Sequence, residues 1–380
     1  MREVYLDNAA TTCCSPEAAQ LALELMTQDY GNPSSLHSKG LAAQLRLDAA
    51  RCRLADALGC TSDEVLFTSG GTESNNLAIL GAVEARRRGG KTIVAMSTAH
   101  SSVRAPLAYL EKSGYTMRSI DPLDDGSTDP DALADAVDGD TVLLCLELVG
   151  SEVGAVTPVA ELARRVRRRF PGVFIHCDAV QGLGKLSFAA SRLGVDSLSV
   201  SAHKIQAPKG CGALYLKKGS RILPRLYGGA QEHGLRAGTE NVPLSCAFGL
   251  AAQRRTERLE ADLAHVEALR EYFVNIARGI PGICINSPRS ATPYIQNLSV
   301  PGYRSETMLH FLAQRGVYVS SGSACSRGAA SHVLRAMRLA PERVDSAIRV
   351  SFSPQSTAGE IDLFFEALRE GINTIARSKP

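Results

Sequence analysis

Short apolar, β-branched segments alternate with helical patterns between about residues 60 and 216, and this alternation constrains the fold most. Apolar strands that are separated by helices predict an α/β fold with a mostly parallel sheet covered on both faces. Ligands of such sheets bind outside the carboxyl ends of the strands, where loops lead into helices. We expect seven strands, at residues 65–69, 92–97, 116–121, 141–149, 173–180, 197–202 and 211–216.

The pattern changes after residue 250. Residues 251–279 read as one long charged helix that bridges into a second region. Residues 360–377 carry apolar side chains at helical spacing, which predicts a helix packed on a small sheet. A chain of 380 residues is longer than one core usually fills, so we expect about two domains.

The charge balance argues against a highly charged partner. The chain has 42 Lys and Arg against 39 Asp and Glu, a net charge of +3, which gives no reason to expect nucleic acid or an acidic membrane. The N-terminal residues show no secretory signal, and Glu147 interrupts an apolar stretch that is far shorter than the ~20 residues needed to span a bilayer. We therefore expect a cytoplasmic protein that contacts neither membrane nor nucleic acid directly.

Two residue types need separate interpretation. The ten cysteines form no CxxC pair and no Cys/His zinc spacing, so we predict no metal site and no disulfide framework, and expect most of them to be small buried side chains. Arginines crowd the segment that is predicted to be helical at 158–170. A solvated helix face is the simpler interpretation, and a docking surface for an acidic partner or RNA is the alternative. These arginines are Arg164, Arg165, Arg167, Arg168 and Arg169.

Three segments that follow predicted strands carry anion-binding or reactive residues. Gly70, Gly71 and Thr72 open a helix whose N-terminus favours a phosphate, although a plain strand-to-helix turn needs the same residues. Asp178 ends a strand, where its carboxylate either points into the crevice or caps the turn. Lys204 follows the next strand; a buried lysine amine forms Schiff bases, whereas an average lysine is a solvated surface charge.

Taken together, these three features describe a pyridoxal 5'-phosphate site. The lysine would hold the cofactor, the turn would hold its phosphate, and the aspartate would pair with the pyridine nitrogen. The ion pair keeps that nitrogen protonated, so the ring accepts the electrons released when a substrate loses its Cα proton.

With these residues in place, the chain resembles the cysteine desulfurases, in the class V branch of the fold-type I pyridoxal phosphate enzymes. The resemblance covers essentially the whole chain, in the family's order, and its motifs are specific in combination. The matching segments are His100 and residues 5–12, 31–35, 70–74, 176–181, 201–204, 228–232, 236–241, 320–325 and 346–352.

The resemblance implies an architecture and an assembly. It implies a large cofactor-binding domain at residues 15–254 with a mostly parallel seven-stranded sheet. A smaller α+β domain would comprise residues 1–14 and 255–380. It also implies a homodimer with shared sites, in which Thr239 reaches the phosphate held by the other subunit.

The resemblance also implies roles for individual residues. Lys204 would bind the cofactor covalently and move a proton, while His100 would stack on the ring and assist that transfer. Asp178 would pair with the ring nitrogen, and Gln181 would contact the phenolic oxygen. Arg349 would anchor the substrate carboxylate with its bidentate fork. The phosphate would be held by Gly71, Thr72, Ser201 and His203.

One position departs from the family's pattern. Family members usually carry Asn-Asn-Glu where this chain has Gly150, Ser151 and Glu152. The second Asn normally contacts the phenolic oxygen, and Ser151 is shorter. The contact is therefore expected to be lost, bridged by water or made by Gln181 alone.

Cys325 is the residue that would make the cofactor site a desulfurase. It lies in a long segment of small residues, Ser-Ser-Gly-Ser-Ala-Cys-Ser-Arg-Gly, which resembles the family's mobile-loop branch. Such a loop would let the thiolate travel between the substrate and a distant acceptor. The alternative interpretation is a buried structural cysteine, since reactivity depends on the thiol pKa.

The resemblance therefore predicts the conversion of L-cysteine to L-alanine with a persulfide formed on Cys325. The sulfur would pass to an acceptor protein such as an iron–sulfur scaffold or a tRNA-thiolation enzyme. Two alternatives stay open: a selenocysteine or cystine lyase of the same fold, and a non-catalytic scaffold for a sulfur-handling partner.

Overall fold

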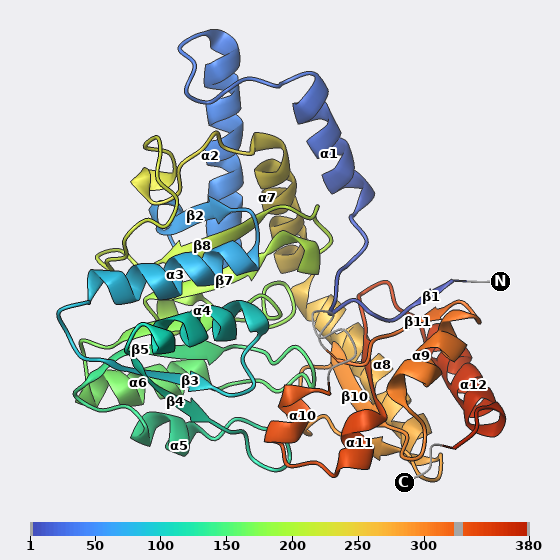
Figure 1. The fold of residues 1–380 in the computed structure, drawn as a ribbon. Helices are drawn as coiled ribbons and strands as arrows, with labels where there is room; N and C mark the ends of the chain where they lie inside the picture. The colour runs from blue at the N-terminus through green and yellow to red at the C-terminus, as the bar shows by residue number, and fades with distance from the viewer. Residues whose placement is uncertain (1–2, 323–329, 378–380) are drawn as a thin grey trace.

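The computed structural model describes residues 3–322 and 330–377, and Cys325 therefore lies outside the described residues. Its largest element is a seven-stranded sheet with the strand order β2-β8-β7-β6-β5-β3-β4 (Figure 1). β8 pairs antiparallel with both β2 and β7, and the remaining neighbours pair parallel, so the predicted mostly parallel sheet is confirmed. The strands are β2 Val65–Thr68, β3 Thr92–Met96, β4 Thr116–Ile120, β5 Thr141–Glu147, β6 Phe174–Asp178, β7 Ser197–Ser201 and β8 Gly212–Leu216.

Helices cover both faces of this sheet, and apart from the edge strand β4 nearly all of its side chains are buried on both faces, to which successive residues point in turn. Ile93 packs in one core with helices α3 and α4, whereas the next residue, Val94, packs in the other core with α2, α5, α6 and α7. Two covered faces explain why the strands read as continuous apolar runs. The helices are α2 Ser38–Leu58, α3 Gly71–Ala85, α4 Ser101–Lys112, α5 Pro130–Asp135, α6 Val159–Arg169 and α7 Val242–Glu257.

A smaller region surrounds a three-stranded antiparallel sheet with the order β12-β10-β9. A second, two-stranded sheet pairs β1 near the N-terminus with β11, far along the chain (Figure 1). α12 begins with a capping box between Thr357 and Glu360, and its buried Phe364 and Phe365 pack on Phe273 of α8. The remaining elements are β1 Val4–Tyr5, α1 Pro16–Thr27, α8 Leu259–Arg278, β9 Cys284–Ile285, β10 Ile295–Ser299, α9 Ser305–Ala313, β11 Val317–Tyr318, α10 His332–Ala336, α11 Pro341–Asp345, β12 Ala347–Ser351 and α12 Ala358–Thr374.

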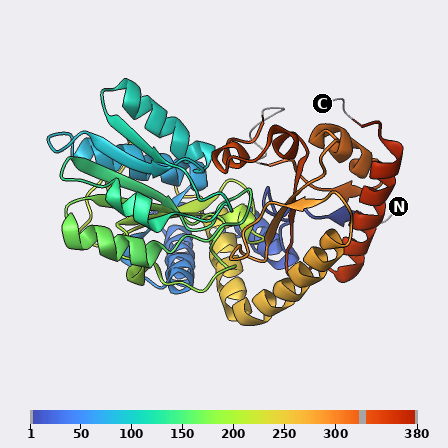
Figure 2. The same cartoon turned by 90° about the horizontal axis from the view of Figure 1, so that it is seen from below.

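The prediction of one long helix over 251–279 is wrong, because the helix breaks at Arg258. Figure 2 shows the two resulting helices meeting at an angle. The bend lets Arg255 and Asp262 form a buried ion pair with a 2.6 Å contact between Nη1 and Oδ2. In a straight helix, residues seven apart lie about 10.5 Å apart along the axis, so this pair would not form. Neither Gly nor Pro marks the break, and the sequence pattern therefore missed it.

The predicted domain boundaries stay predictions. α7 runs through the expected boundary at 254/255 and ends at Glu257, immediately before the break. Within the described residues, none of the helices combines the length and the apolar character needed to cross a membrane.

The arginine-rich helix α6 pairs with acidic residues of the chain itself. Arg165 forms an ion pair with Asp131, Arg169 lies 3.2 Å from Asp135, and Arg167 pairs with the partly buried Asp196. These contacts favour the interpretation of α6 as a solvated helix face.

The expectation that most cysteines are buried is wrong. Of the nine described cysteines, all with free thiols, four are buried, at Cys145, Cys177, Cys211 and Cys246. Cys13 and Cys52 are exposed.

Candidate active site

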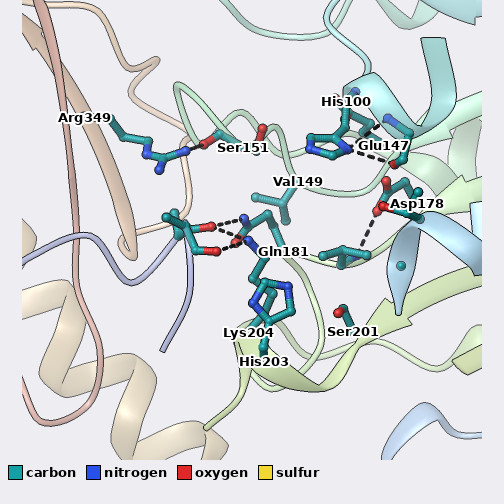
Figure 3. A pocket seen from close by; sticks show the side chains of 16 residues that line it. His100, Glu147, Val149, Ser151, Asp178, Gln181, Ser201, His203, Lys204 and Arg349 are labelled. Carbon is teal, nitrogen blue, oxygen red and sulfur yellow. Dashed lines mark hydrogen bonds between the residues drawn. The ribbon is translucent and has the colours of Figure 1, made fainter. Parts of the chain in front are cut away.

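A cavity of about 220 Å³ lies at the carboxyl ends of β5, β6 and β7 (Figure 3). It is where the sequence placed a ligand site, because the loops that leave parallel strands meet at this edge. The predicted site residues that line it are Gly71, Thr72, His100, Ser151, Asp178, Gln181, Ser201, His203, Lys204 and Arg349. Thr239 lies on an exposed loop away from this lining. The roles of all these residues stay predictions.

Asp178, at the end of β6, is held by two N–H donors. Asn75 Nδ2 donates to Oδ2 at 2.8 Å, and the backbone N of Val180 donates to Oδ1 at 3.0 Å. Asn75 is oriented in turn by His176, whose Nε2 lies 2.9 Å from Asn75 Oδ1. Burial lowers the pKa of His176 to about 3, so the ring is neutral; its Nδ1 then accepts from Ser197 Oγ, and Nε2–H donates to the amide oxygen. The carboxylate is therefore fixed by a chain of satisfied buried groups.

Lys204 lies immediately after β7 and is tied to the N-terminal segment. Its Nζ donates to the carbonyl oxygens of Ala9 and Ala10, at 2.6 and 2.8 Å. That segment is held by Ser351 of the small sheet, whose Oγ accepts from Ala9 N at 2.8 Å. The position of the amine therefore depends on three segments that are far apart in sequence.

His100 caps the N-terminus of α4 and is neutral. Its Nδ1 accepts from the backbone N of Ser102 at 3.2 Å, which leaves the proton on Nε2. Burial lowers the pKa of the imidazole, with Asp178 acting in the opposite direction. A neutral imidazole suits stacking on an aromatic ring and proton transfer.

Glu147 is a lining residue that the sequence analysis did not assign to the site. It ends β5 in register with Asp178 of β6, is 3% exposed, and accepts from the backbone N of His100 at 2.7 Å through Oε1. Its Oε2 has no hydrogen-bond partner among the described residues. Burial, and then the charge of Asp178, raise the pKa of Glu147 well above its ordinary value, which favours the protonated carboxyl group. The sequence signal that could have indicated Glu147 as a site residue is a carboxyl group at the end of an otherwise apolar strand.

The wall formed by the start of α3 suits a phosphate. The helix begins at Gly71, where a Cβ would lie 2.6 Å from Val180 Cγ2, so only glycine allows this close approach. Gly71 and Thr72 of the first helical turn, whose N–H groups have no partner within the helix, and Ser201 line the same cavity. Burial, with Lys204 next in effect, lowers the pKa of His203 to about 4, so it is neutral here.

Arg349, on β12 of the small sheet, reaches the opposite wall. It is 2% exposed; Nη2 donates to Asp7 Oδ1 and Nη1 to the backbone oxygen of Ser151, both at 2.9 Å. Its Nε is buried without a hydrogen-bond partner among the described atoms. Ser151 therefore contacts Arg349 through its main chain. This hydrogen bond does not depend on whether the side chain at position 151 is Ser or Asn.

These residues fit pyridoxal phosphate. The amine of Lys204, the carboxylate of Asp178 and an anion-binding helix start line one cavity, and these are the groups that bind its aldehyde, ring nitrogen and phosphate. No group of three or more His, Cys, Asp or Glu side chains in the described parts of the chain is arranged to hold a metal ion.

Comparisons with known proteins agree with this geometry. The aminotransferase class-V family model matches residues 4–364. A cysteine desulfurase IscS of Dictyoglomus turgidum is 37% identical over 384 residues, covering 100% of this chain and 97% of the relative. The solved structure of a NifS-like protein has a TM-score of 0.94 and 33% identity, covering 98% of this chain and 100% of that one. A structure of SspA in complex with cysteine has a TM-score of 0.81 and 29% identity, covering 94% and 100%.

The family match includes strands of both the large and the small sheet, so it covers every wall of the cavity. The full-length relatives confirm the resemblance that the motifs indicated, and the solved structures confirm the fold-type I architecture. The chain belongs to the aminotransferase class-V family, and relatives that it matches over its full length are named cysteine desulfurases.

Proposed function

We propose that this protein is a pyridoxal phosphate-dependent cysteine desulfurase that converts L-cysteine to L-alanine and transfers the sulfur to Cys325. The observation that carries the proposal is the single cavity lined by Lys204, Asp178, His100 and Arg349. Full-length relatives named cysteine desulfurase, and a similar solved structure that holds cysteine, support the same reaction.

The residues divide the work between holding the cofactor and moving a proton. When bound, pyridoxal phosphate supplies an electron-accepting ring that stabilises negative charge at the substrate Cα. Lys204 holds the cofactor through its amine and, once released, moves the proton at Cα. Asp178 keeps the ring nitrogen protonated, and neutral His100 covers the ring.

Arg349 binds the substrate carboxylate in this proposal. A guanidinium presents paired N–H donors that match a carboxylate, and Arg349 lines the cavity. The contacts to Asp7 and Ser151 hold the group in place.

The sulfur transfer uses Cys325. Its thiolate attacks the substrate sulfur, the carbon–sulfur bond breaks with its electron pair returning to the substrate carbon, and a sulfur–sulfur bond forms on Cys325. The substrate carbon then takes a proton. The balance is L-cysteine plus a thiol giving L-alanine plus a persulfide, which passes to an acceptor such as an iron–sulfur scaffold or a tRNA-thiolation enzyme in the cytoplasm.

A homodimer is part of the proposal. Large apolar side chains are exposed on α1, α2 and the segment between them, a surface that a second copy would cover. Thr239, exposed and away from its own cavity, is free to serve a partner's site. The exposed residues are Leu23, Met26, Tyr30, Leu36, Leu41 and Leu45.

One assay tests the reaction: purified protein is incubated with L-cysteine and a thiol reductant, and alanine and sulfide are measured. We expect equal yields of the two products and a visible cofactor absorbance band that Lys204→Ala abolishes. Cys325→Ser should keep the band and lose transferable sulfur. Absence of alanine, or faster turnover of selenocysteine or cystine than of cysteine, would contradict the proposal.

A further inference from the structure

We propose that Lys185 is a positioning residue for this reaction, which fixes the side-chain amide of Gln181 so that an N–H faces the cofactor. The inference rests on the proposed function. Lys185 follows Gln181 by four residues, in the turn after β6, and was not singled out by its sequence context.

The hydrogen bonds of Gln181 define the orientation of its amide. Nε2 donates to the backbone oxygen of Ala9 at 2.8 Å, and Oε1 accepts from Lys185 Nζ at 2.8 Å. Ala9 lines the cavity, whereas Lys185 does not. The amide nitrogen is therefore bonded to a residue of the cavity wall, and the amide oxygen is bonded to a residue outside the lining. A carbonyl oxygen only accepts, so a flipped amide would set Gln181 Oε1 against Ala9 O and lose the hydrogen bond between Gln181 and Ala9.

Stability does not explain a lysine at this position. Lys185 is 4% exposed, and no carboxylate lies within 4 Å of its amine among the described residues. The charged groups that act on it are Lys204, Arg255 and Arg349, all cationic, and burial together with these charges lowers its pKa. The amine of Lys185 also lies 5.9 Å from the centroid of the Tyr294 ring, near the outer limit for a cation–π contact. Burying an amine among three cations, with no anionic partner, costs free energy that an apolar side chain of the same length would not cost.

The oriented amide has a chemical use. An N–H on the cavity side donates to an anionic oxygen, whereas a C=O there would repel it. The N–H donated by Lys185 to Oε1 polarises the amide and strengthens the donation from Nε2. Lys185 would thus act through Gln181 to stabilise the ionised phenolic oxygen of the cofactor, a contact for which Ser151 offers a shorter side chain than the usual Asn.

The test is a pH titration of the cofactor absorbance band in holoenzymes. We expect Lys185→Met to raise the midpoint by about one pH unit, a tenfold change in the equilibrium. Gln181→Leu should raise it at least as much, and the double variant should match Gln181→Leu alone. Lys185→Arg, which retains a cationic donor, should restore most of the wild-type midpoint. Lys209→Met is the matched control, since it removes an exposed lysine charge close to His203 without contacting Gln181.

Several outcomes would overturn the inference. An unchanged midpoint in Lys185→Met would do so, as would a shift that persists in full in the Gln181→Leu background, because that shift would come from charge alone. The Tm of Lys185→Met should equal or exceed that of the wild type, whereas a lower Tm or failure to fold would assign a structural role instead. A wild-type protein without any cofactor band would instead refute the proposed function.

Discussion

The two walls of the cavity differ in how completely Asp178 and Arg349 are paired, although Glu147 on the large-sheet wall also keeps one oxygen, Oε2, without a partner among the described residues. On the wall from the large sheet, Asp178, Asn75 and His176 form a buried chain in which each member has its partners. On the wall from the small sheet, Arg349 keeps a buried Nε without one. Satisfied networks are rigid, whereas an unpaired buried donor is costly until a ligand arrives. The large-sheet wall suits a resident cofactor, and the small-sheet wall suits a substrate that comes and goes.

Substitution of Asp178, on the large-sheet wall, should have the largest effect on activity. Asp178→Ala removes the charge that keeps the ring nitrogen protonated, so we expect kcat to fall by about 10²- to 10³-fold. Alanine formation under saturating cysteine measures this loss. A fall of less than fivefold, with the cofactor still bound, would show that Asp178 only caps its turn.

Substitution of Arg349, on the small-sheet wall, should affect the binding of cysteine rather than the chemical step. Arg349→Lys removes the bidentate fork and keeps the charge, and we expect KM for cysteine to rise about 10- to 100-fold with a smaller change in kcat. The cofactor band should be unchanged, in contrast to the Lys204 variant. If KM stays constant while the band is lost, the assignment of the two walls is reversed.

A smaller effect is expected from the substitution of Asn75, whose side chain donates a hydrogen bond to Asp178. Asn75→Leu removes the donor to the carboxylate and leaves the buried His176 without its amide partner, a cost of about 1–3 kcal/mol. We expect about a tenfold loss in kcat and a lower Tm. Asn76→Leu is the matched control, because the half-buried Asn76 on the same helix donates to the backbone oxygens of Thr72 and Ser102 and bonds no side chain among the described residues. Equal losses in both variants would refute a specific role for Asn75.

The smallest effect should come from Glu147→Gln, because an amide replaces a carboxyl group that is already neutral. The folded-state pKa of Glu147 is raised. Just above pH 4.5 the unfolded chain therefore loses this proton while the folded protein keeps it, and the free energy of unfolding of the wild type falls as the pH rises from there. The glutamine variant should therefore be more stable at pH 7 and equally stable below pH 4. Thermal unfolding between pH 4 and 8 measures the difference. A constant difference across that range would mean that Glu147 is ionised in the folded protein.

Local patterns predicted much of the large sheet and its ligand edge. Asp178 and Lys204 were found from the sequence because each follows an apolar strand within a few residues. Arg349 was placed only by the family resemblance. Glu147 and Lys185 were missed, since a polar residue near a strand end reads the same whether it faces a cavity, the core or solvent.

The sequence alone determined the strand alternation and the chemistry available at the strand ends, because side-chain periodicity depends on neighbours a few positions apart. Only the tertiary structure decided which distant residues meet. Arg349 bonds Asp7 across 342 positions, and Lys204 bonds Ala9 across 195. The break at Arg258, which brings Arg255 and Asp262 together as a buried ion pair, likewise has no signal in the local sequence. Such contacts depend on how whole elements pack, and periodicity carries no information about that packing.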